Sequence, residues 1–69
     1  MNPLQALRIS RHLSVAELAQ RLGLGRAQLV DIEAGKRLLS SQEKADFADR
    51  LDIPPQTLDS ITRGNAINK

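Results

Sequence analysis

The chain has 69 residues, a formal net charge of +2, and 41% hydrophobic and 26% charged residues, which is the composition of one small globular domain. With no cysteine, one histidine (His12) and one aromatic residue (Phe47), it excludes disulfides, thiolate chemistry, a histidine metal cluster and base-stacking platforms. No apolar run approaches the ~20 residues of a membrane span, and the N-terminus does not resemble a signal peptide, so we expect a cytoplasmic protein.

The first two predicted helices both begin at strong capping residues. Asn2 precedes a proline and an apolar periodicity, which predicts a helix over residues 3–12. Ser14 and Glu17 form the spacing of a capping box, in which the hydroxyl accepts from one backbone amide and the carboxylate from another. This box predicts a short helix over residues 15–22, with one apolar stripe at Leu18, Ala19 and Leu22.

The third predicted helix lies between two glycine signals. Gly23 ends the preceding helix, Gly25 occupies the next N-cap position, and Gly35 is the following stop signal. We therefore predict a helix over residues 26–34, with Leu29 facing inward together with Ile32. The outward positions are Arg26, Ala27, Val30, Asp31 and Ala34.

The remaining signals are also helical. Ser40 and Glu43 offer a second capping box, for a helix over residues 41–51. A Pro-Pro pair then breaks the chain and opens a helix over residues 55–62. The expected inward residues of these helices are Ala45, Phe47, Ala48, Leu51, Leu58 and Ile61. We predict an all-α, five-helix domain over residues 1–64 and a flexible tail over residues 65–69.

The helices predicted at 15–22 and 26–34 are short and are joined by Gly23-Leu24-Gly25. Two helices joined by a tight glycine-containing turn form a helix-turn-helix unit. Ala19 supports this interpretation, because steeply crossing helices need a small residue where their backbones approach.

At this point the sequence resembles the Cro/lambda-repressor-like helix-turn-helix domains of phage repressors and bacterial regulators. The resemblance covers about residues 4–61 and is carried by 13–24, 29–37 and 47–53. It implies a compact lambda-repressor-like fold and a sequence-specific double-stranded DNA-binding regulator, a repressor of a small operon, phage or mobile element. The chain departs from the family at Val15, where Gln is frequent, and at Gly25, where Ser or Thr is usual.

The resemblance also implies which residues read bases. It places Arg26, Ala27 and Asp31 at base-reading positions, with Gln28 adjacent. Arginine pairs bidentately with guanine O6 and N7, alanine meets a thymine methyl, and a carboxylate accepts from cytosine N4. An alternative role for Asp31 is to orient Arg26.

The charge distribution points to the same half of the chain. Residues 1–39 hold six basic and three acidic side chains, against four basic and five acidic in 40–69. We expect phosphate contacts from the amides of Val15 and Ala16 at a helix N-terminus and from basic side chains. The basic residues are Arg8, Arg11, Lys36 and Arg37. The resemblance further implies a partly buried ion pair between Arg8 and Glu33.

Leu38 and Leu39 form an apolar pair in a polar connection, which either fills a gap in the core or meets a partner. A small domain reads few base pairs, so we expect a homodimer, at least on DNA, on a palindromic operator. Leu58 and Ile61 are the expected dimer surface. The alternative function is an antitoxin-like or other protein-interaction module of the same fold. We expect no enzymatic activity, no cofactor and no metal.

Overall fold

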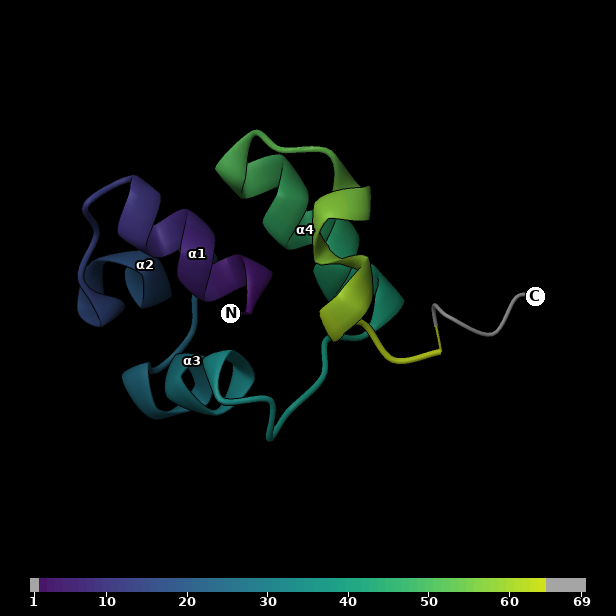
Figure 1. The fold of residues 1–69 in the computed structure, drawn as a ribbon, viewed down its shortest axis with the longest axis horizontal. Helices are drawn as coiled ribbons and strands as arrows, with labels where there is room; N and C mark the ends of the chain where they lie inside the picture. The colour runs from purple at the N-terminus through teal and green to yellow at the C-terminus, as the bar shows by residue number, and fades with distance from the viewer. Residues whose placement is uncertain (1, 65–69) are drawn as a thin grey trace.

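The computed structural model describes residues 2–64, which form an all-α fold (Figure 1). The elements are α1 (Pro3–Ser10), α2 (Val15–Leu22), α3 (Arg26–Glu33), α4 (Ser41–Leu51) and the 3-10 helix η1 (Pro55–Ile61). This confirms the predicted fold class. The predicted bounds of α2 and α4 are correct, whereas the other helices end one or two residues earlier than predicted. The predicted tail, residues 65–69, lies outside the described residues.

The early end of α1 has a local cause. His12 takes the left-handed conformation with φ of 56°, which a helix cannot continue through. The Leu13 amide then donates to the Arg8 carbonyl at 3.0 Å and closes the turn. Asp52 ends α4 in the same way, with φ of 57°. Both residues occupy positions where glycine is usual. The sequence therefore carried no stop signal at His12, whereas the Pro-Pro pair after Ile53 indicated the end of α4.

The predicted caps are present and tie the elements together. In the first capping box the Glu17 amide donates to Ser14 Oγ at 3.0 Å, and the Ser14 amide donates to Glu17 Oε1 at 2.8 Å. The equivalent box at the start of α4 has distances of 3.0 and 2.9 Å. Asn2 caps α1 and also donates from Nδ2 to the Ile32 carbonyl at 2.9 Å. This last bond fixes the start of α1 to the last turn of α3.

One apolar core joins all five elements. Its members are Leu4, Leu18, Ala19, Leu22, Leu29, Ile32, Leu39, Phe47, Ala48, Leu51, Leu58 and Ile61. None of the helices in residues 2–64 combines the length and the apolar character that crossing a bilayer requires.

Burial corrects the predicted partner surface. Leu39 and Leu58 are 0% exposed and Ile61 is 6% exposed, so all three belong to the core. This confirms the gap-filling alternative for Leu39 and the inward positions of Leu58 and Ile61, and the prediction that they form a dimer or partner surface is wrong. The cause is a long-range pairing, in which the Leu39 amide donates to the Ile61 carbonyl at 2.8 Å and draws Leu39 inward. Leu38 remains 42% exposed, and Ala45, which was expected to face inward, is exposed.

Candidate nucleic-acid interface

The turn between α2 and α3 sets the direction in which α3 leaves the fold. Gly23 adopts φ of 70°, and the Leu24 amide donates to the Ala19 carbonyl at 2.8 Å, which ends α2 tightly. Leu24 packs against the core, and α3 begins after Gly25. The result is a helix that forms the lower edge of the molecule in Figure 1.

The inner and outer faces of α3 differ in their exposure to solvent. Leu29 and Ile32 are both 0% exposed and hold the helix to the core. The five residues predicted to point outward are all exposed: Arg26, Ala27, Val30, Asp31 and Ala34. Within residues 2–64 no other segment covers this outer face, so it is free to meet a large partner.

The N-terminus of α3 has half of a capping box, which comes from the side chain of Gln28 in the first turn. Gly25 has no side chain, but its amide donates to Gln28 Oε1 at 2.8 Å. The next backbone amides therefore keep no side-chain acceptor, as at an open helix N-terminus. Gln28 lies in the predicted reading segment, and its Oε1 is turned toward the Gly25 amide. Its Nε2 group and the second lone pair of Oε1 have no partner in this contact.

The first turn of α2 presents the amides that were predicted to contact phosphate. The capping box uses the amides of Ser14 and Glu17, which leaves those of Val15 and Ala16 without a capping side chain. The Ser14 amide, and then its hydroxyl, hold the pKa of Glu17 below its ordinary value. This end of α2 therefore combines open amide donors with one fixed carboxylate.

The predicted ion pair between Arg8 and Glu33 is confirmed. Arg8 Nε lies 2.8 Å from Glu33 Oε2, and Nη2 lies 3.1 Å from Oε1. Arg8 Nη1 also donates to the Leu13 carbonyl at 3.1 Å. The Arg8 and Glu33 side chains are only 16% and 7% exposed, and the hydrogen bond to Glu33 raises the pKa of Arg8. These contacts favour a structural role for Arg8, which ties α1 to the end of α3, over a phosphate contact.

Arg37 is likewise held by the fold. Its Nη2 lies 2.7 Å from Glu43 Oε2, and its Nη1 is buried without a hydrogen-bond partner. By contrast, Arg26 and Lys36 make no ion pair within the described residues. Arg26 and Asp31 are therefore not paired with each other, and the geometry gives no support to an orienting role for Asp31.

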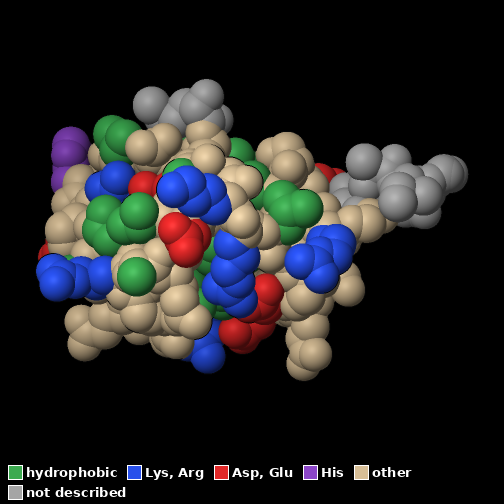
Figure 2. Space-filling model, turned by 90° about the horizontal axis from the view of Figure 1, so that it is seen from below, with side chains coloured by type: hydrophobic (Ala, Val, Ile, Leu, Met, Phe, Trp, Pro, Cys, Tyr) green, Lys and Arg blue, Asp and Glu red, His purple; other side chains and the backbone are tan. Residues whose placement is uncertain are grey.

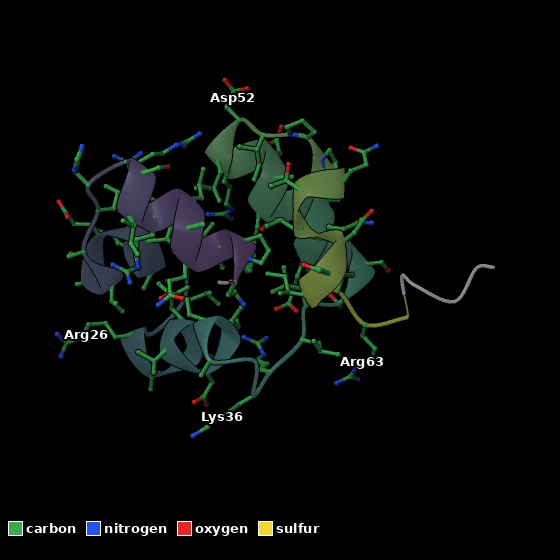
Figure 3. The ribbon with its side chains drawn as sticks, viewed as in Figure 1. Arg26, Lys36, Asp52 and Arg63 are labelled. Carbon is green, nitrogen blue, oxygen red and sulfur yellow. The ribbon has the colours of Figure 1, made fainter. Side chains whose placement is uncertain are left out.

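Arg26, Lys36 and Arg63 are three of the basic residues that make no ion pair within residues 2–64. In Figure 3 all three lie in the lower half of the molecule, with Arg26 extending to the left and Lys36 at the bottom, whereas Asp52 lies at the top. The face seen in Figure 2 carries Lys and Arg side chains with some acidic and hydrophobic groups between them. Sequence reasoning missed Arg63, whose backbone amide donates a hydrogen bond to the Leu39 carbonyl at 2.7 Å. No local pattern could have indicated that long-range contact.

Comparison with protein families gives a match that spans α1 to η1. The model of the helix-turn-helix domain family matches residues 3–61. The chain belongs to the helix-turn-helix domain family. Comparisons with curated proteins and with solved structures gave no significant match. In this helix-turn-helix domain α2 and α3 are the two helices of the motif, in agreement with the resemblance to Cro/lambda-repressor-like domains.

Proposed function

We propose that this helix-turn-helix domain is a sequence-specific regulator that binds double-stranded DNA and reads the major groove with α3. The observation that carries the proposal is the free outer face of α3, opposite the buried Leu29 and Ile32. A helix ~10–12 Å in diameter fits the major groove, which is ~12 Å wide. In motifs of this kind the second helix lies in that groove and its N-terminal residues meet base edges.

Four side chains on or beside this face are assigned to base reading. Arg26 pairs with guanine O6 and N7 through its guanidinium fork, and Ala27 contacts a thymine methyl. Asp31 accepts from cytosine N4. Gln28 offers its Nε2 donor while Oε1 caps Gly25, and the bidentate contact that glutamine makes with adenine requires its amide to turn away from Gly25.

Phosphate contacts surround this reading surface. We assign them to the amides of Val15 and Ala16 and to Arg11, Lys36 and Arg63, which make no ion pair within residues 2–64. Arg37 takes part only if it leaves Glu43. Each phosphate that is neutralised makes the slope of log K against log salt more negative by ~0.9, so binding weakens steeply as the salt concentration rises.

The biological form that we propose is a homodimer on a palindromic operator in the cytoplasm. One α3 helix spans few base pairs, and two-fold pairing on half-sites about one helical turn apart doubles the sequence that is read. The resemblance to phage repressors and bacterial regulators is what supports a repressor of a small operon, phage or mobile element.

A second candidate function is an antitoxin-like or protein-interaction module. Two observations favour it: Leu38 is 42% exposed beside α3, and Asp31 places a negative charge on the reading face. Under this alternative, Leu38→Ala abolishes binding of a protein partner while leaving DNA binding intact.

The test is selection of bound sequences from random duplex DNA. The wild type is expected to enrich a palindrome that contains a conserved guanine in each half-site, and Arg26→Ala is expected to relax that position. Arg26→Lys is the matched control, because it keeps the charge and loses the bidentate fork. It should retain non-specific affinity and lose guanine preference. The absence of any enriched sequence with the wild type would refute the proposal.

A further inference from the structure

Val30 is an apolar side chain that the fold itself does not use. It is 50% exposed, on the outer side of α3. The other large exposed hydrophobic residues of the described chain are Ile9 on α1 and Leu38 in a connection, at 49% and 42%. A β-branched residue at an exposed helix position also costs helix propensity relative to alanine. Stability therefore gives no reason for valine at this position.

The position of Val30 relative to Arg26 is specific. Residues four apart on a helix lie about 40° apart around its axis, so both side chains share one flank of α3. Asp31 lies about 140° from Arg26 and belongs to the other flank. Two cations without ion pairs lie at the two ends of this helix, Arg26 at its start and Lys36 beyond its end (Figure 3). A polyanion that engages both ends is brought against Val30.

We propose that Val30 is a specificity-determining residue that packs against the C5 methyl group of a thymine in the major groove. This inference rests on the proposed function and deepens it. The thymine methyl is the apolar group that a base pair displays in this groove, and an aliphatic side chain without donors or acceptors is complementary to it. Cytosine, which lacks the methyl group and presents an amino donor, is disfavoured at the same position.

The geometry also sets where that thymine lies. Four residues rise ~6 Å along the helix, which is close to two base-pair steps of ~3.4 Å. The thymine is therefore expected about two base pairs from the guanine that Arg26 reads, in the same half-site. A protein partner fits this patch less well, because one valine among small and charged neighbours cannot provide the ~800 Å² per partner of a stable interface.

The experiment uses uracil, which differs from thymine only by the missing methyl group. Each thymine of the selected duplex is replaced in turn, and affinity is measured by fluorescence anisotropy. At one thymine per half-site, about two base pairs from the guanine, the wild type should bind about fourfold more weakly, as expected for one buried methyl group. Val30→Ala should bind the thymine duplex about fourfold more weakly and show no further loss with uracil.

Matched variants distinguish this contact from the loss of any exposed apolar side chain and from loss of folding. Ile9→Ala removes an equally exposed apolar side chain from α1 and should keep the full uracil penalty. Val30→Thr retains the shape of valine but replaces one methyl by a hydroxyl, and it should show a reduced penalty. Helical circular dichroism checks that each variant is folded.

The outcomes distinguish the two proposals. If the wild type enriches a sequence but no thymine in it shows a uracil penalty, the inference about Val30 is wrong and the proposed function stands. The inference is equally wrong if Val30→Ala keeps the full uracil penalty. A change in self-association of that variant in sedimentation would then assign Val30 to a protein contact. If the wild type enriches no sequence, the proposed function itself fails.

Discussion

Breaking the ion pair between Arg8 and Glu33 should destabilise the domain more than the substitution of any exposed charged residue. In Arg8→Met the Glu33 carboxylate, 7% exposed, loses both of its guanidinium hydrogen bonds and remains buried. A fully buried charge left unpaired costs ~3–5 kcal/mol. Because Arg8 is 16% exposed and some water reaches the pair, we expect about 3 kcal/mol. A chain of this length has a total stability of only ~3–10 kcal/mol, at ~0.05–0.15 kcal/mol per residue.

The assay is urea denaturation followed by the circular dichroism signal of the helices. Arg8→Met/Glu33→Leu should be more stable than Arg8→Met alone, because the double variant leaves no unpaired buried charge. Arg50→Ala is the control, since the pair between Arg50 and Asp46 is about half exposed and is worth less than ~1 kcal/mol. The reasoning is refuted if Arg8→Met lies within 1 kcal/mol of the wild type, the scale of an exposed pair, or if the double variant is the less stable of the two.

Three further predictions follow from the caps and from the charge on the reading face. The stabilising effect of Glu17, whose pKa is lowered by Ser14, is complete above its unfolded pKa of ~4.3 and is lost as pH falls through the lower folded pKa. Glu17→Gln keeps a capping acceptor and should flatten the decline of Tm from about pH 5 downward; an unchanged acid decline would contradict this. Gly23→Ala should cost ~1–2 kcal/mol in urea denaturation because φ is 70°, although the new Cβ would meet no atom closer than 3.8 Å. Gly25→Ser, at an ordinary φ, should be neutral or stabilising, and equal losses at both glycines would refute the conformational explanation. Asp31→Asn should raise affinity for non-specific DNA in anisotropy at low salt, by up to about fivefold for ~1 kcal/mol of lost repulsion. Weaker non-specific binding would show that Asp31 makes a favourable contact instead.

Local chemistry explains what the sequence predicted well. The bounds of α2 and α4 follow from Ser/Glu capping boxes and from stop signals a few residues away, all within one segment. The free outer face of α3 followed from the spacing of Leu29 and Ile32. The pair between Arg8 and Glu33 joins residues 25 positions apart, and only the family resemblance indicated it.

The errors concern contacts that no local pattern encodes. The sequence left Leu39 open between the core and a partner surface, and its pairing with the segment after η1 decides for the core. The same pairing positions Arg63, for which the sequence gives no local signal. His12 adopts a left-handed conformation without being glycine, so α1 was predicted two residues too long. The spacing of Gln28 gives no sign that its Oε1 accepts from the Gly25 amide.

The most direct test of the account replaces single atoms in the groove that α3 is proposed to occupy. Substituting 7-deazaguanine for the conserved guanine removes N7, an acceptor displayed only in the major groove. The wild type should bind this duplex about tenfold more weakly, within the ~1–3 kcal/mol of a bidentate contact, and Arg26→Ala should not distinguish the two duplexes. Inosine at the same position removes only the minor-groove amino group and should leave affinity unchanged. A loss with inosine, together with indifference to 7-deazaguanine, would contradict major-groove reading by α3.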